Sequence, residues 1–211
     1  MWLHVLLAVL AGYLLGNLNG AVIVSRLLDH KDVRDQGSGN AGLTNFLRMY
    51  GPVSALAVIA IDVLKALAAC FIGKMLLAPY DLAVEGTLIG GLSVNIGHDF
   101  PAFLGFRGGK GVLCGVTAAF AADWRCGLVT IAIFVIILCL TRYVSLGSVL
   151  GSLSFAILFP ILHWGRIPAV IMGIILPALI IFMHRSNISR LLSGTERKAT
   201  FSKFRRKKES P

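Results

Sequence analysis

The stretch from Val53 to Leu77 reads VSALAVIAIDVLKALAACFIGKMLL and carries only three charged side chains. A helix of roughly 20 apolar residues crosses a bilayer core about 30 Å thick, so this stretch predicts a membrane-spanning helix. Asp62 and Lys65 lie three residues apart within it. Because an ionised group at membrane depth costs about 3 kcal/mol unless it is paired, we predict an ion pair that locks helix packing. A substrate contact is the alternative.

Six other apolar stretches have the same character. They are Trp2–Val24, Leu82–Ile96, Val112–Trp124, Leu128–Leu140, Leu146–Leu162 and Ile167–Met183. The three in the middle of the chain are short for a span. They are expected to be short spans, tilted helices extended by their flanks, or re-entrant pieces.

The composition agrees with a membrane protein. Apolar residues make up 56% of the 211 positions and charged residues 14%, against roughly 45–50% and about 25% in ordinary globular domains. The mean hydropathy is +0.81. Soluble enzymes, disordered proteins and secreted disulfide scaffolds therefore fit poorly, and the fold class predicted is all-α, a polytopic integral membrane helical bundle. The four cysteines are scattered without a CxxC pair, so neither a metal site nor a cofactor is expected.

The distribution of positive charge predicts the topology. The chain carries a net charge of +10, and in membrane proteins basic residues gather in cytoplasmic loops, so nucleic acid is not expected as a partner. With the N-terminus outside and seven spans, 16 of the 20 Lys and Arg residues fall in the inside segments 25–52, 97–111, 141–145 and 184–211. We therefore predict about seven spans and a cytoplasmic C-terminus. Five spans is the rival odd number.

The chain is predicted to form a single membrane domain over residues 1–211. Its polar motifs fall in the cytoplasmic segments 32–48, 97–112 and 184–196, and residues 197–211 form a basic tail. Five basic residues between Lys203 and Lys208 are expected to attract anionic lipid headgroups, at about 1 kcal/mol each, and to have no catalytic role.

The first motif is GSGNAGLTN at 37–45, with Arg48 three residues further on. Its glycines allow a tight turn that aims backbone N–H groups at one point, followed by a short helix whose N-terminus favours an anion. Arg48 adds a guanidinium suited to phosphate. The motif predicts an anion site, with a flexible polar loop as the alternative. Its candidate binding residues are Gly37, Ser38, Gly39, Asn40, Thr44, Asn45 and Arg48.

The second motif is GHDFPAFLGFRGGKG at 97–111. Arg107 and Lys110 bracket Gly108 and Gly109, and cations interleaved with glycine at a helix start predict a second phosphate-sized site. His98 is a possible base. The alternative is that both cations are only membrane anchors.

The third motif is HRSNISRLLSGTE at 184–196, directly after the last apolar stretch. On a helix, His184 and Asn187 share one face, as do Asn187 and Arg190. One face could therefore offer an imidazole, an amide and a guanidinium at the membrane surface, and the alternative is a helix end with an incidental histidine. Ser145, in a predicted cytoplasmic turn, is a further candidate for contact with phosphate.

These three motifs, with DVLK at 62–65, resemble the bacterial acyl-phosphate:glycerol-3-phosphate acyltransferase family. The resemblance rests on DVRDQGSGNAGLTNFLR at 32–48, GHDFPAFLGFRGGKGV at 97–112 and HRSNISRLLSGTE at 184–196, and covers nearly the whole chain. It implies a multi-pass enzyme of the bacterial inner membrane with its active site on the cytoplasmic side. It also implies transfer of a fatty acyl group from acyl phosphate to the 1-hydroxyl of sn-glycerol 3-phosphate, the first step of phospholipid synthesis.

In such a reaction the protein must hold two anionic phosphates together, orient the hydroxyl group and stabilise an oxyanion. The cations expected to offset phosphate repulsion are Arg48, Arg107, Lys110 and Arg185, with backbone donors at Gly37, Gly39, Gly108 and Gly109. Ser38 and Asn187 are the candidates for orienting the reacting groups. The proton acceptor is expected to be His184, then His98, or the substrate's own phosphate.

Two other functions share some of these features. A transporter for a phosphorylated solute would also be polytopic with basic cytoplasmic sites, but no inverted pair of broken segments is visible in the sequence. A lipid-binding scaffold would have no need of paired loops that combine cations with glycine.

Overall fold

The computed structural model describes residues 1–199, which form helices joined by turns and contain no strand. The basic run predicted between Lys203 and Lys208 lies outside the described residues. The helices are α1 Trp2–Gly16, α2 Gly20–Asp29, α3 Leu43–Tyr50, α4 Pro52–Leu77, α5 Ala83–Asp99, α6 Val112–Ala122, α7 Trp124–Thr141, α8 Val144–Leu162, α9 Ile167–Met183 and α10 Arg185–Leu192. Three short 3-10 turns complete them, at Val33–Asp35, Ala78–Tyr80 and Ala102–Leu104.

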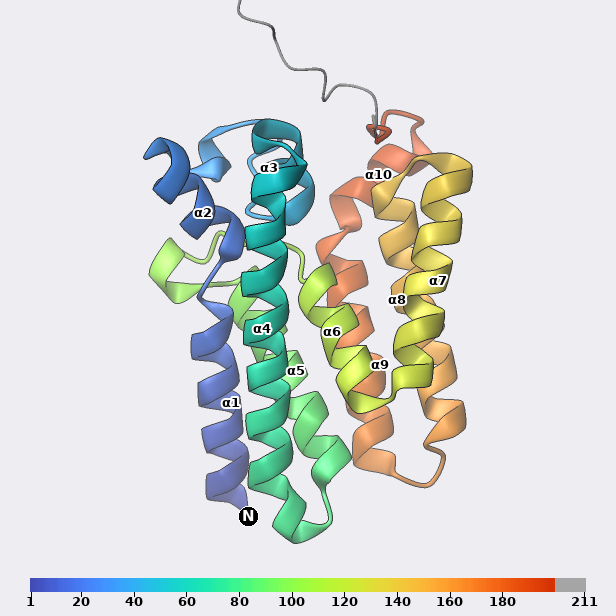
Figure 1. The fold of residues 1–211 in the computed structure, drawn as a ribbon. Coiled ribbons are helices and arrows are strands. Elements are labelled where there is room, and N and C mark those ends of the chain that lie inside the picture. The colour runs from blue at the N-terminus through green and yellow to red at the C-terminus, as the bar shows by residue number, and fades with distance from the viewer. Residues whose placement is uncertain (200–211) are drawn as a thin grey trace, which may run out of the picture.

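The long helices stand side by side in one bundle (Figure 1). Helix α5 packs against α1 and α4, α8 packs between α7 and α9, and α6 and α9 connect the two groups. Helices α2, α3 and α10 lie together at one end, and the N-terminus lies at the other (Figure 1). The all-α helical bundle predicted from composition is therefore confirmed.

Four stretches are long and apolar enough to cross a membrane, namely 2–29 taken through its break, 52–80, 124–141 and 144–162. A fifth is obtained if α9 and α10, bent by 58° from each other, count as one span. Helix α6 covers only 11 residues, or about 17 Å at 1.5 Å per residue, and cannot cross a bilayer core alone. Seven spans remains a prediction.

Three predicted boundaries were wrong. The apolar stretch 2–24 is not one helix, because α1 ends at Gly16 and the Asn19 side chain caps α2 by accepting a bond from the Val22 N–H. The stretch 112–124 ends at Ala122, and Trp124 opens the next helix. That helix continues to Thr141 and is longer than the predicted 128–140.

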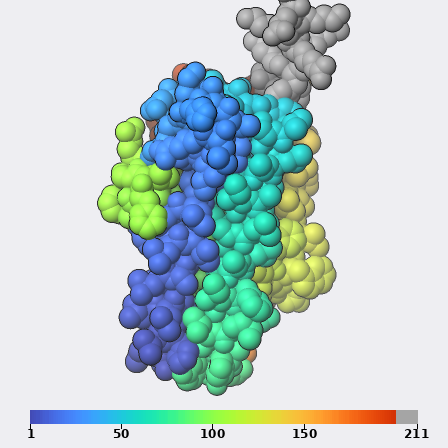
Figure 2. All heavy atoms as spheres, turned by 60° about the vertical axis from the view of Figure 1, so that its left-hand side comes forward, coloured from blue at the N-terminus to red at the C-terminus, as the bar shows by residue number. Residues whose placement is uncertain are grey.

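Small residues bring the helices close together. A Cβ atom at Gly73 on α4 would lie 2.1 Å from the carbonyl oxygen of Gly86 on α5, so no larger residue fits this crossing. Such contacts are typical of helix association in membranes, where packing replaces the hydrophobic effect. The outer surfaces carry exposed leucine, isoleucine and phenylalanine side chains, including Phe103 at 73% and Phe106 at 63% exposure. The segment with these two residues projects from the side of the bundle (Figure 2).

The ion pair predicted within the second apolar stretch is confirmed. Lys65 Nζ lies 2.7 Å from Asp62 Oδ1, and both side chains are only 2% exposed. At the end of the bundle that holds the N-terminus, Arg125 pairs with Asp123 and Arg166 pairs with Glu85. The opposite end, with α2, α3 and α10, carries the basic segments and the site described next (Figure 1).

Candidate active site

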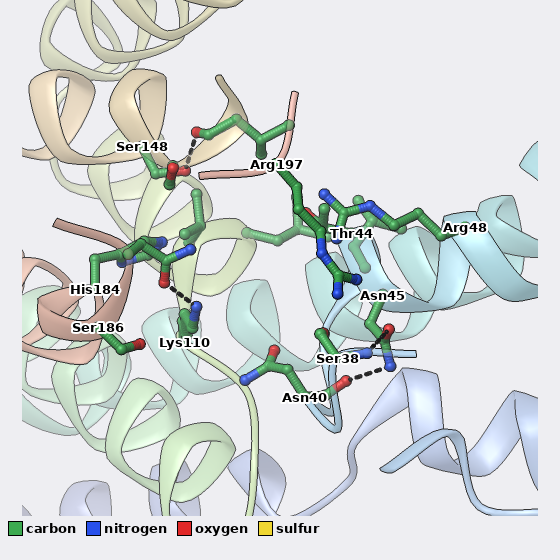
Figure 3. Close-up of a pocket in the computed structure, with 18 of the residues that line it drawn as sticks. Ser38, Asn40, Thr44, Asn45, Arg48, Lys110, Ser148, His184, Ser186 and Arg197 are labelled. Atoms are coloured by element: carbon green, nitrogen blue, oxygen red, sulfur yellow. Dashed lines mark hydrogen bonds between the residues drawn. The ribbon is translucent and has the colours of Figure 1, made fainter. Parts of the chain in front are cut away.

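A cavity of about 700 Å³ opens at the end of the bundle that carries the three motifs. All three motifs contribute to its lining. The predicted residues that line it are Gly37, Ser38, Gly39, Asn40, Thr44, Asn45, Arg48, Lys110, Ser145, His184 and Asn187. Lys110 and His184 lie on one side, and Thr44 and Arg48 on the other (Figure 3). The fold thus brings together residues that are more than 140 positions apart.

Asn45 organises the glycine-rich loop from within. Its Nδ2 lies within 3.1 Å of the carbonyl oxygens of Val33, Gln36 and Asn40, and its Oδ1 accepts the Ser38 N–H. The amide is only 2% exposed and its bonding capacity is used internally. Asn45 thus shapes the loop that presents Ser38, and its assignment to phosphate binding stays a prediction.

The backbone donors predicted in the second motif are also engaged elsewhere. The Gly108 N–H donates to the Asp99 carbonyl and the Gly109 N–H to the His98 carbonyl. In the first motif, the Gly39 N–H donates to the Gln36 carbonyl. A bonded N–H is not free to bind a phosphate oxygen, so the prediction of backbone donors was wrong at Gly39, Gly108 and Gly109. Gly108 and Gly109 also lie outside the cavity lining.

Two predicted cations are not part of the cavity lining. Arg185 stacks on the Phe182 ring at 4.6 Å and donates to the Phe182 carbonyl. Arg107 is exposed, and only its carbonyl oxygen has a described partner, the Arg34 guanidinium at 3.0 Å. Neither residue lines the cavity. Their assignment to phosphate therefore has no support from the cavity lining, since sequence spacing gives no information on where each side chain projects.

Asn187 and Lys110 meet in the cavity although they come from different motifs. The Lys110 ammonium donates to Asn187 Oδ1, and Asn187 Nδ2 donates to Glu196 Oε1 at 2.7 Å. Ser145 Oγ donates to the same carboxylate oxygen at 2.7 Å, and Arg190 Nε donates to Glu196 Oε2 at 2.7 Å. Glu196 therefore fixes the orientation of the Asn187 amide and gathers three site residues.

The imidazole of His184 is held in one orientation. It lies between α9 and α10 with 4% exposure, and its Nδ1 bonds to the Ile180 carbonyl at 2.8 Å. A carbonyl can only accept, so Nδ1 carries the proton and Nε2 keeps its lone pair. Burial lowers the pKa of His184 to about 4, and the Lys110 charge adds to this effect. The imidazole is therefore neutral near pH 7.

Sequence reasoning missed several lining residues. Glu196 and Arg197 line the cavity, as do Ser148 and Ser186. Arg190, which was predicted to share one helix face with Asn187, lines the cavity as well. Glu196 and Arg197 follow α10 on a turn that returns to the cavity, where the Ala199 N–H donates to the Arg142 carbonyl. No local pattern in the sequence indicates that return.

The polar end of the cavity is strongly cationic. Its cations are Arg48, Lys110, Arg190 and Arg197. Burial lowers the pKa of Lys110, and the neighbouring positive charges of Arg190 and Arg48 lower it further. Burial also lowers the pKa of Arg48, and the positive charge of Arg197 adds to this effect. Burial opposes ionisation of Glu196, but hydrogen bonds from Asn187, Ser145 and Arg190 outweigh it and lower its pKa. Such a surplus of positive charge suits more than one anionic group.

The deeper part of the cavity is apolar. Its lining there consists of Leu113 and Val116 on α6 with Ile131 and Phe134 on α7. Val116 also lines a small cavity between α6, α7, α8 and α9. One continuous space can therefore hold an anionic head and an apolar body.

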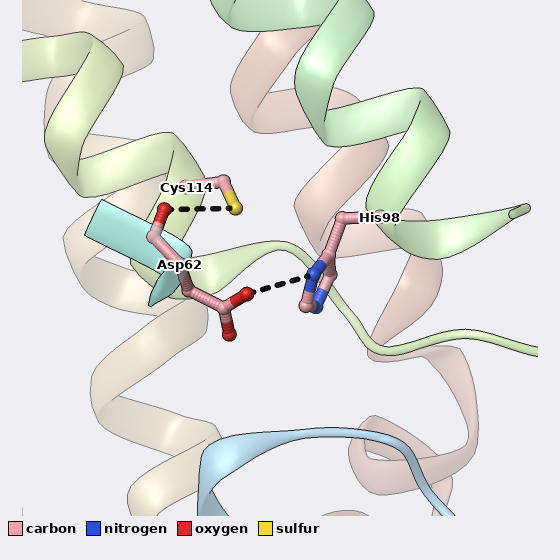
Figure 4. Close-up of side chains that lie close together, drawn as sticks. All are labelled: Asp62, His98 and Cys114. Atoms are coloured by element: carbon pink, nitrogen blue, oxygen red, sulfur yellow. Dashed lines mark hydrogen bonds and ion pairs between the residues drawn. The ribbon is translucent and has the colours of Figure 1, made fainter. Parts of the chain in front are cut away.

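One group of possible metal ligands was not expected from the sequence. Asp62, His98 and Cys114 come from α4, α5 and α6, and their ligand atoms lie within 4.8 Å of one another (Figure 4). They are 36 and 16 residues apart in sequence, so no spacing motif indicates them. The Lys65 ammonium lies among them, 2.7 Å from Asp62 Oδ1 and 2.9 Å from His98 Nδ1. A cation already occupies this place, so the group does not fit a metal ion.

Comparisons with known proteins agree with this geometry. Residues 6–194 match the family model described as glycerol-3-phosphate acyltransferase. The chain is 43% identical over 196 residues to the glycerol-3-phosphate acyltransferase of Thermoanaerobacter sp. strain X514, covering 93% of this chain and 96% of that protein. It is 41% identical to the enzyme of that name from Clostridioides difficile strain 630, with coverage of 92% and 95%.

The fold is similar to a solved structure of PlsY (YgiH), described as an integral membrane glycerol 3-phosphate acyltransferase in its glycerol 3-phosphate form. The TM-score is 0.82 at 32% identity, covering 93% of this chain and 96% of that one. A second structure of PlsY, in its lysophosphatidic acid form, matches with a TM-score of 0.80 at 31% identity. The motifs, the cavity and these matches lead to one conclusion: the chain belongs to the glycerol-3-phosphate acyltransferase family and is an integral membrane acyltransferase of the PlsY type.

Proposed function

We propose that this enzyme transfers a fatty acyl group from acyl phosphate to the 1-hydroxyl of sn-glycerol 3-phosphate. The products are 1-acyl-glycerol 3-phosphate, a lysophosphatidic acid, and inorganic phosphate. The reaction is the first step of phospholipid synthesis and takes place at the cytoplasmic face of a bacterial inner membrane, in a seven-span chain with its N-terminus outside. It uses no cofactor.

The observation that carries the proposal is the division of one cavity into a cationic end and an apolar interior. Arg48, Lys110, Arg190 and Arg197 supply charge for two phosphate groups, whereas Val116, Ile131 and Phe134 line a space fit for a hydrocarbon chain. The two similar PlsY structures are named for a glycerol 3-phosphate form and a lysophosphatidic acid form. A phosphorylated acceptor and an acylated product both suit such a cavity.

The chemical step is a direct acyl transfer. The 1-hydroxyl oxygen of glycerol 3-phosphate attacks the acyl carbonyl carbon, and the bond from that carbon to the phosphate oxygen breaks. The phosphate leaves with the electron pair, so no covalent enzyme intermediate is needed. The protein contributes by overcoming repulsion between two anions and by holding them in a reactive orientation. Lys110, Arg48 and the Ser38 hydroxyl are positioned for this task.

Two proton acceptors are compatible with the site. The Nε2 lone pair of neutral His184 is one, since Nδ1 is fixed by Ile180. The acceptor's own phosphate, with a second pKa of about 6, is the other. His98, the second histidine considered, is a poor choice because its Nδ1 lone pair faces the Lys65 ammonium at 2.9 Å.

The proposal is tested with purified protein and a palmitoyl phosphate donor. Inorganic phosphate release should depend on added glycerol 3-phosphate and match the lysophosphatidic acid formed, mole for mole. Palmitoyl-coenzyme A should support no transfer. Lys74→Met, an exposed change on α4 far from the cavity, serves as the control for preparation and assay.

Phosphate release that does not depend on added glycerol 3-phosphate would refute the proposed acceptor. Equal transfer from the coenzyme A ester would refute the proposed donor. The transporter considered from the sequence would release no phosphate. It has lost its support, because the family to which the chain belongs is one of enzymes.

A further inference from the structure

Lys65 lies at the centre of a buried cage beneath the cavity. Its Nζ contacts Asp62 Oδ1 at 2.7 Å, the Leu18 carbonyl at 2.7 Å, the Gly16 carbonyl at 3.3 Å and His98 Nδ1 at 2.9 Å. An ammonium has three N–H donors and no acceptor, so these partners use its full capacity. Asp62 Oδ1 also accepts the Gly20 N–H at 3.3 Å. The pair therefore satisfies backbone groups on both sides of the break between α1 and α2.

The contact with Lys65 determines which ring nitrogen of His98 carries the proton. Because the Lys65 ammonium can only donate, its 2.9 Å contact makes His98 Nδ1 the acceptor and places the ring proton on Nε2. The Asp62 carboxylate also faces this nitrogen, but at 3.7 Å it lies beyond hydrogen-bond distance. The ring is 5% exposed, and it lines the cavity together with Asp62. A buried ammonium thereby selects one tautomer and one orientation of the imidazole.

The oriented ring supports the turn that carries Lys110. A Cβ at Gly109 would lie 2.1 Å from His98 Nε2, so the turn lies directly against the imidazole. The Gly109 N–H donates to the His98 carbonyl at 3.1 Å. Rotation or displacement of the ring would push against the residue next to Lys110.

A second route connects the cage to the same turn. Asn19, directly after the Leu18 carbonyl bound by Lys65, donates through Nδ2 to the Ala41 carbonyl at 3.0 Å. The Ala41 N–H in turn donates to the Gly108 carbonyl at 3.4 Å. The helix break, the first motif and the second motif are thus connected in series.

We propose that Lys65 is a positioning residue for the acyl transfer. Its buried ammonium fixes the His98 tautomer and the backbone at the break between α1 and α2. Lys110 and the first motif are thereby held at the correct separation. Lys65 contacts neither substrate. A displacement of about 1 Å at reacting groups can cost about 10²-fold in rate, so its loss should lower kcat far more than it raises KM. The kinetic part of this proposal rests on the proposed function.

The kinetic experiment compares Lys65→Met with Lys74→Met, the same substitution at an exposed site on the same helix. We expect kcat to fall about 10²-fold in the first, and to stay within about twofold in the second. Because Lys65→Met leaves Asp62 charged and buried, it can fail to fold. Lys65→Met/Asp62→Asn removes both charges, keeps the acceptor for Gly20, and is measured alongside with the thermal midpoint of each protein.

A substrate-free experiment tests the same proposal independently. In the ¹⁵N spectrum of histidine-labelled wild-type protein, assigned with a His98→Gln variant, His98 should show an unprotonated Nδ1 and a protonated Nε2. In the folded double variant the ring should show a mixture of tautomers. A wild-type proton on Nδ1, or a folded double variant with wild-type kcat, overturns the proposal. Failure of the proposed reaction would leave the spectrum unaffected, so the two failures are distinguishable.

Discussion

The side chains of Lys110 and Asn187 meet in the cavity although they are 77 residues apart, and the lysine ammonium donates to the asparagine oxygen. Asn187 in turn donates to Glu196, whose carboxylate also accepts hydrogen bonds from Ser145 and Arg190. The second and third motifs are thereby joined into one wall of the site. The first motif forms the opposite wall, with Thr44 and Arg48 facing Lys110 (Figure 3).

Lys110→Met should remove a cation from the cavity and leave the fold intact. A hydrogen bond to a charged group contributes about 1.5–3 kcal/mol, so kcat/KM for glycerol 3-phosphate or acyl phosphate should fall by about 10-fold to 10²-fold. Arg107→Met, three residues earlier and outside the cavity lining, is the matched control. Steady-state kinetics with each substrate varied in turn decide the outcome. Equal losses in both variants would contradict the placement of the two side chains.

Asn45→Ala should destabilise the enzyme, whereas Ser38→Ala should not. Removal of the Asn45 amide deprives three backbone carbonyls and the Ser38 N–H of a partner, at a cost of about 1–3 kcal/mol. Ser38 is exposed and lines the cavity, so its loss should lower kcat at an unchanged thermal midpoint. Thermal unfolding in detergent, paired with kinetics, tests both expectations. A stable Asn45→Ala protein would show that its bonds do not shape the loop.

Glu196→Ala should lower both stability and activity more than Glu196→Gln does. The carboxylate accepts from Ser145, Asn187 and Arg190, and glutamine keeps one acceptor oxygen. We expect a loss of about 1–3 kcal/mol for alanine. Asp81→Asn, which removes an exposed charge at the opposite end of the bundle and suits the left-handed backbone there, is the control. An unchanged thermal midpoint in Glu196→Ala would contradict its bridging role.

The pH dependence of kcat/KM should identify the proton acceptor. With its pKa at about 4, His184 is already the free base above pH 5. Its ionisation therefore cannot make kcat/KM change between pH 5 and 7. The substrate phosphate, with a second pKa of about 6, would make the rate fall with acidity in that window. A fall in kcat/KM with an apparent pKa near 6 that persists in His184→Ala indicates the phosphate. A fall with an apparent pKa near 4 that disappears in that variant indicates His184.

Val116→Phe should shorten the preferred acyl chain. Val116 lines both the main cavity and the small cavity beyond it, so a larger side chain there closes the deep end of the apolar space. Transfer from palmitoyl phosphate should fall relative to octanoyl phosphate, measured as the ratio of kcat/KM values. An unchanged ratio would mean that the acyl chain lies elsewhere.

Much of this architecture was predictable from the sequence. The apolar stretches and the low charged fraction predicted the helical bundle, and the three motifs contained many of the residues that line the cavity. The ion pair of Asp62 with Lys65 followed from helical geometry, since residues three apart share a face. These features depend on local periodicity or on composition.

The rest depends on contacts between distant residues. No spacing pattern in the sequence relates the partners in three sets of hydrogen bonds. These are the bonds of Gly108 and Gly109 to the end of α5, the bond from Asn187 to Glu196, and the bonds around Lys65. The helix break at Asn17 to Asn19 was missed because apolar residues flank it on both sides, although residues 16–20 read GNLNG and Asn19 is a good capping residue. Arg107 and Arg185 are outside the cavity lining, because the backbone conformation and not the residue type decides where a side chain projects.

The central claim is that three separate segments converge on one face of the membrane, the cytoplasmic one. Single cysteines replace the exposed residues Ser38, Arg107 and Ser186, one in each segment, in a background without native cysteine. Trp164, 87% exposed at the opposite end of the bundle, is the fourth position. With a membrane-impermeant maleimide, the first three should react only in inside-out vesicles and position 164 only in right-side-out vesicles. Labelling of position 38, 107 or 186 from the outside would contradict the account.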